Sequence, residues 1–99
     1  MKRMEPKERI SLCIPRMEAE IPKDYIYNKI KDLNIGNIQK MTEIPHRKDP
    51  SQKRILMRIS SNERTRSELN KFEDKLEEHG SVKYVYNMPW YWKIVATHS

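Results

Sequence analysis

The sequence predicts an α+β domain in which an antiparallel sheet is backed by two helices. Several short segments alternate apolar and polar residues, which is typical of half-buried strands. Two other segments space their apolar residues three or four positions apart, which is typical of helices. The length of 99 residues allows one small core and excludes a two-domain enzyme with an interdomain cleft.

The first strand is expected over residues 9–14, where polar and apolar residues alternate. Its apolar members are Ile10, Leu12 and Ile14. Pro15 is expected to end it, because proline lacks the N–H that a sheet ladder uses. The first helix is expected over residues 22–33, since Pro22 suits a first turn and Gly36 offers a stop. Its apolar face consists of Ile26, Ile30 and Leu33.

Two further strands follow, separated by a polar loop. Residues 38–44 predict a strand with a bulge or a frayed edge, because Ile38, Met41 and Ile44 do not keep one parity. The loop is the proline-punctuated stretch P-H-R-K-D-P-S-Q at 45–52. The next strand alternates two sets of three residues, Ile55, Met57 and Ile59 against Arg54, Leu56 and Arg58.

The second helix is expected to begin at a capping box formed by Thr65 and Glu68 and to stop at His79-Gly80. Its apolar face consists of Leu69, Phe72 and Leu76. Residues 63–78 carry a net charge of −2. Because the whole chain carries +6, the remaining residues together carry +8. The basic character of this protein therefore lies outside the second helix.

The C-terminal part predicts two strands, 82–86 and 90–96, joined by a three-residue connection at 87–89. The complete order contains the βαββαβ arrangement of a ferredoxin-like split βαβ fold. Both helices then cover one face of the sheet, and the other face meets solvent or a partner. The expected core consists of Ile10, Leu12, Ile14, Ile26, Ile30, Leu33, Met41, Ile55, Met57, Ile59, Leu69, Phe72, Leu76, Trp92 and Ile94.

Cysteine usage and the N-terminal segment indicate a soluble intracellular protein. Cys13 is the only cysteine, which excludes an intramolecular disulfide and a thiolate zinc cluster and favours a reducing compartment. The N-terminal residues lack the apolar stretch of a secretory signal, and no window is apolar enough to span a membrane. We expect a flexible basic segment at 1–8 and a single domain at 9–97.

The order of elements and two segments resemble the RNA-recognition motif (RRM) over residues 9–96. L-C-I-P-R-M at 12–17 and Q-K-R-I-L-M-R-I at 52–59 occupy the places of that family's two signature strands. Cys13, Arg54 and Leu56 stand where the family presents base-stacking aromatic residues. The resemblance implies an RRM-like fold whose nucleic-acid binding is weak, salt-sensitive and poorly selective for sequence.

Three segments carry a narrower resemblance: S-L-C-I-P-R-M at 11–17, N-I-G-N-I at 34–38 and M-P-W-Y-W-K-I at 88–94. They are similar to the small RRM-like proteins of nucleocytoplasmic large DNA viruses. This resemblance implies a stand-alone domain made in infected cells, located in their cytoplasm or packaged in the virion. It implies a fold and a setting but no mechanism.

A basic sheet face is the first functional hypothesis. Arginine and lysine side chains on an open strand face bind phosphates, and arginine planes also stack on unpaired bases. The candidate nucleic-acid-binding residues are Arg16, Lys40, Arg47, Lys48, Arg54, Arg58 and Lys93. His46 and Lys53 belong to the same basic stretches. The sequence does not distinguish DNA from RNA, and a merely solvated basic surface remains the alternative.

The rival hypothesis is a protein-interaction or virion structural module that forms a homodimer through the open sheet face. The apolar centre of that interface would consist of Cys13, Leu56, Tyr91 and Val95. Tyr84, Tyr86, Trp90, Tyr91 and Trp92 lie close together in sequence and are compatible with a stacking platform, an interface or core packing. Alternation places Trp92 and Ile94 in the core and Tyr91, Lys93 and Val95 on the open face.

No constellation of residues indicates catalysis. His46, His79 and His98 are isolated and lack the spacing of metal ligands. Both glycines are explained by helix ends, so no loop cradles a phosphate group. We expect a protein that is not an enzyme, uses no cofactor or metal, binds no small-molecule substrate and does not associate with membranes.

Overall fold

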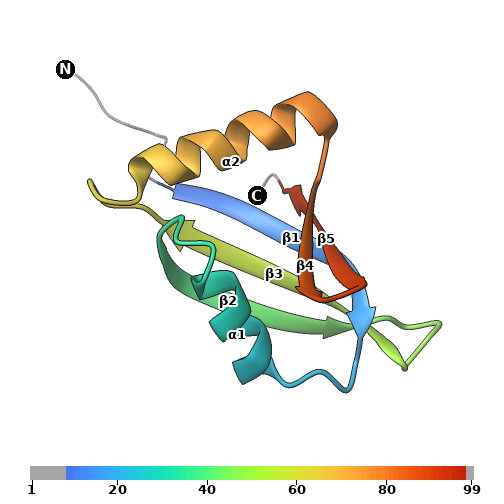
Figure 1. The fold of residues 1–99 in the computed structure, drawn as a ribbon. Coiled ribbons are helices and arrows are strands. Elements are labelled where there is room, and N and C mark those ends of the chain that lie inside the picture. Colours follow the sequence, from blue (N-terminus) through green and yellow to red (C-terminus); the bar gives the residue numbers. More distant parts are fainter. Residues whose placement is uncertain (1–8, 98–99) are drawn as a thin grey trace.

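Five antiparallel strands form one sheet in the order β2-β3-β1-β5-β4, and two helices pack against it (Figure 1). The structure, a computed structural model, describes residues 9–97, so the expected flexible segment at 1–8 lies outside the described residues. The elements are β1 (Arg9–Glu18), α1 (Lys23–Lys31), β2 (Asn37–Pro45), β3 (Gln52–Ser60), α2 (Arg66–His79), β4 (Val82–Asn87) and β5 (Trp90–Ala96). The predicted α+β class with an antiparallel sheet is confirmed, and the architecture is compatible with a ferredoxin-like fold.

β1 is longer than the sequence predicted, because Pro15 does not end it. The register with β3 shifts between Ile14 and Met17, and the strand continues to Glu18 beyond that irregularity. A bulge tolerates proline, since it leaves a backbone position outside the regular ladder. The carbonyl of Pro15 accepts a hydrogen bond from His46 Nε2 at 2.8 Å, which ties the β2–β3 loop to this point of β1.

The helix ends are set by local contacts that the sequence motifs only partly predicted. α1 ends at Lys31, so Gly36 is not its stop. A Cβ at Gly36 would lie 2.5 Å from the Ser60 carbonyl oxygen, and φ there is 148°, so the close approach to β3 requires glycine. The predicted stop of α2 is confirmed: Gly80 is left-handed, and its N–H donates to the Leu76 carbonyl at 2.7 Å.

The capping box predicted for α2 is wrong. Thr65 occupies the N-cap position, but its side chain caps no helix N–H. Its hydroxyl accepts from the Asn62 N–H at 3.0 Å, and Asn62 Oδ1 accepts from the Arg64 N–H at 2.9 Å. A polar turn that begins at Asn62 therefore organises the start of α2 in place of the Thr65–Glu68 pair.

One hydrophobic core lies between the sheet and the two helices. Thirteen of the expected core residues are buried, whereas Ile10 and Leu33 are only partly buried, and Met17 and Ile35 join the core unpredicted. α1 contributes Ile26 and Ile30, and α2 contributes Leu69, Phe72 and Leu76, to the same cluster. Both helices therefore cover one face of the sheet, and neither helix covers the other face, which we call the uncovered face.

Candidate functional site

The face of the sheet away from the helices carries four of the predicted basic residues. Along β3, Ile55, Met57 and Ile59 are buried in the core, which directs the intervening side chains to the opposite face. We use the term basic face for these four of the exposed cations on the uncovered face: Lys40 of β2, Arg54 and Arg58 of β3, and Lys93 of β5.

The strand register places cations on both sides of an apolar centre. Lys40 of β2 lies opposite Arg58 of β3. Two residues along β3, Leu56 lies opposite Cys13 of β1, which in turn lies opposite Val95 of β5. These three side chains form the apolar centre of the uncovered face, and Arg54 and Arg58 flank it along β3.

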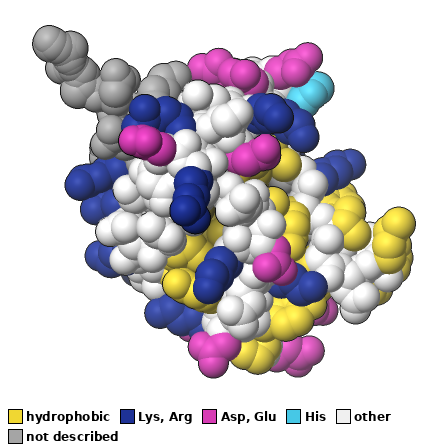
Figure 2. Space-filling model, turned by 60° about the vertical axis from the view of Figure 1, so that its left-hand side comes forward, with side chains coloured by type: hydrophobic (Ala, Val, Ile, Leu, Met, Phe, Trp, Pro, Cys, Tyr) yellow, Lys and Arg dark blue, Asp and Glu magenta, His cyan; other side chains and the backbone are white. Residues whose placement is uncertain are grey.

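Two carboxylates lie on the described strands. Glu43 of β2 points to the helix side, where it pairs with Lys53, whereas Glu18 lies opposite Gln52 at the end of β1, away from the Lys40–Arg58 pair. Figure 2 shows Asp and Glu side chains at the top, over α2, and others at the lower edge, while Lys and Arg side chains line the left-hand margin and also lie across the middle of the view. Charges of both signs are therefore present on this side of the molecule.

A shallow hollow of about 250 Å³ lies between Lys40 and Arg58 on the uncovered face. Besides these two cations it is lined by Ser11, Thr42, Leu56, Met57 and Thr97. Hydroxyl groups and cations are the side-chain donors that most often contact phosphate oxygens. The hollow therefore offers donors of two kinds to an anion resting on the sheet.

Cys13 is buried despite its position on the uncovered face, with 8% of its surface exposed. Burial raises the pKa of its thiol, and the charge of Arg54 offsets part of that rise. The thiol is therefore mainly protonated at neutral pH and behaves as a small apolar side chain rather than a nucleophile.

The β2–β3 loop presents fewer free cations than its sequence suggested. Arg47 and Lys48 are exposed, but His46 is held by the Pro15 carbonyl. Asp49 lies beside them, and its Oδ1 accepts hydrogen bonds from the hydroxyl and the amide of Ser51. These bonds lower the pKa of Asp49, so an anion accompanies the two exposed cations at neutral pH.

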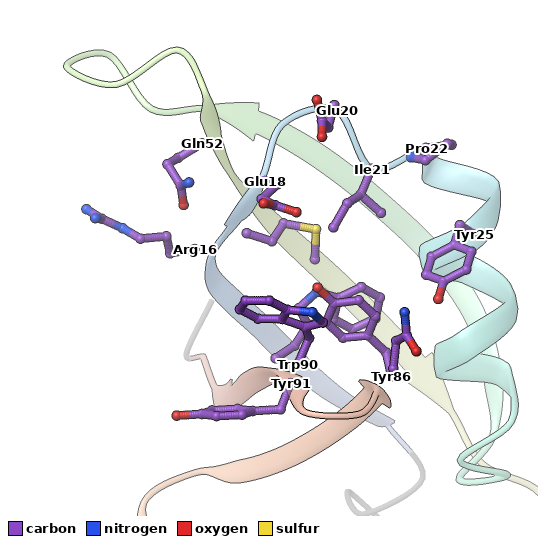
Figure 3. Close-up of a pocket in the computed structure, with 13 residues that line it drawn as sticks. Arg16, Glu18, Glu20, Ile21, Pro22, Tyr25, Gln52, Tyr86, Trp90 and Tyr91 are labelled. Carbon is purple, nitrogen blue, oxygen red and sulfur yellow. The ribbon is translucent and has the colours of Figure 1, made fainter.

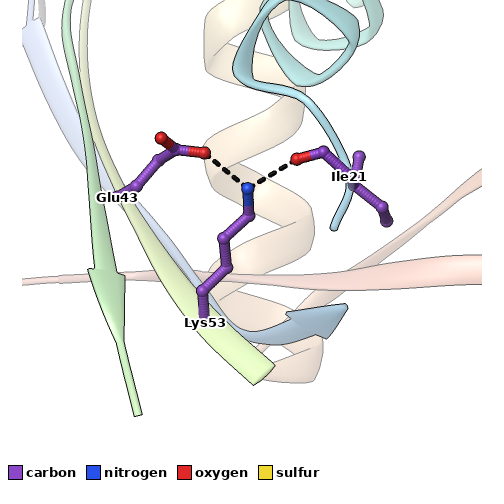
Figure 4. Close-up of polar contacts among 3 residues, drawn as sticks. All are labelled: Ile21, Glu43 and Lys53. Atoms are coloured by element: carbon purple, nitrogen blue, oxygen red, sulfur yellow. Dashed lines mark hydrogen bonds and ion pairs between the residues drawn. The ribbon is translucent and has the colours of Figure 1, made fainter. Parts of the chain in front are cut away.

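Lys53, which the sequence grouped with Arg54 as part of the basic loop cluster, lies on the other side of the sheet. Its ammonium donates to the Ile21 carbonyl and to Glu43 Oε2, both at 2.5 Å (Figure 4). Only 7% of its side-chain surface is exposed. The assignment of Lys53 to the basic cluster was wrong. Side chains alternate along a strand, so Lys53 points to the same face as Ile55, and Arg54 points to the opposite face.

Arg16 is exposed at the β1 bulge. Its positive charge helps to lower the pKa of Asp49, but by less than the hydrogen bonds from Ser51 do. The strand register does not pair it with Lys40 or Arg58, which lie toward the opposite end of β3. Arg16, Arg47 and Lys48 therefore form a separate group of cations near the loop, apart from the Lys40–Arg58 pair.

The C-terminal aromatic residues are divided between the two faces of the hairpin. Trp92 is buried in the core, and Tyr86 stacks on it with ring centroids 4.3 Å apart. The Tyr84 hydroxyl donates to the Lys29 carbonyl of α1 at 3.0 Å. Tyr91 lies on the uncovered face, with the Lys83 ammonium 5.0 Å from its ring centroid. The expected alternation of Trp92 and Tyr91 is therefore observed.

A groove that the sequence did not predict lies between the end of β1, the start of α1 and the β4–β5 hairpin. Its volume is about 790 Å³, and it is open to solvent. We call it the aromatic groove, and its aromatic lining consists of Tyr25, Tyr86, Trp90, Tyr91 and Trp92. Glu18 and Glu20 also line it (Figure 3). The clustered C-terminal aromatics were a signal for this groove, but the contribution of Tyr25 depends on tertiary packing.

No protein-family model, curated protein or solved structure matches this chain. Within the described residues, no group of three or more His, Cys, Asp or Glu side chains is arranged to hold a metal ion. None of the helices in the described part of the chain is long and apolar enough to cross a membrane.

Proposed function

We propose that this protein binds nucleic acid, DNA or RNA, through the basic face, in a binding role rather than a catalytic one. The observation that supports this most directly is the charge pattern of the uncovered face: Lys40, Arg54, Arg58 and Lys93 are exposed there, and Glu43, the one carboxylate on β2, β3 and β5, points to the other face. Such a surface attracts a polyanion over a distance of several ångströms and releases counterions when it binds one.

The same face gives little means of reading sequence. Tyr91 is the aromatic residue on it, at the hairpin edge beside Lys83. Each stacked base contributes about 1–3 kcal/mol in single-strand binding proteins, and the centre of this sheet offers Cys13 and Leu56 instead of aromatic rings. The proposed binding is therefore dominated by phosphate contacts and varies little with base sequence.

We also propose that the fold is RRM-type, with β4 as an additional strand at the edge. The order β2-β3-β1-β5 supports this, because the last strand of the βαββαβ unit then lies beside the first. The resemblance to the small RRM-like proteins of large DNA viruses adds a setting, the infected-cell cytoplasm or the virion.

Fluorescence anisotropy with labelled oligonucleotides tests the function. At about 50 mM salt the protein should bind single-stranded or duplex probes, and the variant carrying both Arg54→Gln and Arg58→Gln should bind them roughly tenfold more weakly. Lys75→Gln removes an exposed cation from α2 and serves as the matched control with unchanged affinity. Absence of binding by the wild-type protein would refute the proposal.

A second candidate function, homodimerisation through the same face, is favoured by the apolar centre formed by Cys13, Leu56 and Val95. A symmetric dimer would cover these residues but would also bring the cations of two copies together, which is unfavourable without an intervening anion. Light scattering distinguishes the two. A dimer in the absence of nucleic acid that Leu56→Glu dissociates would favour self-association, and a monomer at high concentration would remove its support.

A further inference from the structure

The aromatic groove combines exposed π surface with negative charge in a protein that is otherwise basic. We propose that it binds an arginine side chain presented by an extended segment of a partner protein. The site is distinct from the function proposed above, since none of the four cations of the basic face lines the groove and its charge has the opposite sign, although Tyr91 borders both surfaces. Trp90 and Glu18 are the residues that would contact the guanidinium group, and Glu20 adds negative charge at the rim of the groove.

The ring cluster beneath the groove is already assembled. Tyr86 stacks on Trp92, and Tyr25 meets both rings edge to face with centroids 6.3 Å away. Trp92 is 2% exposed, so it acts as the floor, whereas Trp90 is 63% exposed and offers its indole to a ligand. Tryptophan is the aromatic side chain that attracts cations most strongly.

Two carboxylates give the groove its charge. Glu18 and Glu20 are exposed, and within the described chain neither forms an ion pair or accepts a side-chain hydrogen bond. Burial raises the pKa of Tyr86, and the charge of Glu18 raises it further, so the phenol remains neutral beside that carboxylate. A cation entering the groove would therefore meet two carboxylates without a competing partner.

The positive groups around the groove do not cancel this charge. Arg16 is the one cation among the lining residues, and Figure 3 shows it extending away from Trp90 and Tyr86. Pro22, at the start of α1, also lines the groove. A helix N-terminus contributes about half a positive charge, which leaves the carboxylates in excess. Gln52 and Asn87 add neutral amide groups to the wall.

Guanidinium fits this combination better than other ligands do. Its plane stacks on an indole while its edge donates to a carboxylate, so one group satisfies both features. A lysine ammonium makes only point contacts. Nucleotide phosphates would be repelled by Glu18 and Glu20. The volume of about 790 Å³ exceeds that of one side chain, so the groove also accommodates the flanking backbone of an extended segment.

The test uses a capped peptide containing two arginines and the same peptide with citrulline, which is nearly isosteric but uncharged. Amide shifts in two-dimensional NMR spectra report both the site and the affinity. The arginine peptide should shift the amides of Glu18, Glu20 and Trp90 and bind about fivefold or more tightly than the citrulline peptide. Equal affinity of the two peptides, or shifts confined to the basic face, would overturn the proposal.

Variants separate the two features of the groove. Trp90→Ala should weaken arginine-peptide binding about two- to fivefold. The variant with both Glu18→Gln and Glu20→Gln should weaken it about fivefold while leaving oligonucleotide affinity undiminished, because it removes only negative charge. Tyr27→Ala, an exposed α1 position outside the groove, is the control.

Tighter binding of guanosine monophosphate than of the arginine peptide, with shifts at the same amides, would instead identify a nucleotide site and reject the peptide proposal.

Discussion

Cys13 of β1 lies directly opposite Leu56 of β3, at the centre of the sheet face that the two helices leave uncovered. Arg54 is close enough to Cys13 to lower the pKa of its thiol, against the larger rise caused by burial. Because Cys13 is the only cysteine of the chain, this side chain is a single chemical reporter on whatever covers the face.

The first prediction concerns alkylation of Cys13. At about pH 8, iodoacetamide should react more slowly with the folded protein than with the urea-unfolded chain, because burial lowers both access and the thiolate fraction. Arg54→Gln removes the charge that lowers the pKa, so it should slow the reaction further. Mass spectrometry measures the rates. A bound oligonucleotide should protect the thiol, and binding without protection would place the nucleic acid elsewhere.

The second prediction concerns the buried ammonium of Lys53. Glu43→Leu leaves that ammonium with the Ile21 carbonyl alone and should cost roughly 2–3 kcal/mol of unfolding free energy. Lys53→Met should cost only about 1 kcal/mol, since the Glu43 side chain is 36% exposed and can be hydrated. Urea unfolding of both variants and the double variant measures the coupling. Equal costs for the two single variants would contradict this account.

The third prediction compares the two glycines. Gly36→Ala places a Cβ against the Ser60 carbonyl at 2.5 Å, so the chain entering β2 must move away from the end of β3, and we expect a loss of about 3 kcal/mol or more. Gly80→Ala meets open space and carries only the left-handed backbone cost of about 1–2 kcal/mol. Thermal or urea unfolding gives both values, and a larger loss for Gly80→Ala would disprove the close-approach explanation.

The fourth prediction concerns the pH dependence of the β2–β3 loop. The hydrogen bonds from Ser51 lower the folded-state pKa of Asp49 below its ordinary value of 3.8. This contribution to stability is therefore present above the unfolded-state pKa and is lost as pH falls through the lower folded-state value. Ser51→Ala removes the hydroxyl donor and should raise the pKa of Asp49 in an NMR titration. An unchanged value would show that the hydroxyl bond is not formed in solution.

Periodicity predicted most of this fold because each amphipathic segment has one face that must be buried. The parity of Ile55, Met57 and Ile59 located β3 and its uncovered face without further information. Motifs of single residues were less reliable. Pro15 lies within a bulged strand, and Thr65 bonds to Asn62 rather than to its helix, because register and turn geometry decide what these residues do.

The candidate sites show the same division. Strand alternation was enough to place Arg54, Arg58 and Lys93 on one face. The same rule excludes Lys53 from that face, although its neighbours in the sequence had grouped it with the basic residues. The aromatic groove was not predictable. It joins Glu18 and Tyr25 to the distant hairpin residues Tyr86 and Trp90, and only the packing of α1 beside the hairpin brings them together.

The salt dependence of oligonucleotide binding tests the central proposal most directly. Plotting log K against log salt for the wild-type protein should give a steep negative slope, and Arg54→Gln or Arg58→Gln should each make it shallower by about 1, because each removes roughly one phosphate contact. Lys75→Gln on α2 should leave the slope unchanged. A slope near zero for the wild-type protein, or equal slopes for all four proteins, would contradict binding through the basic face.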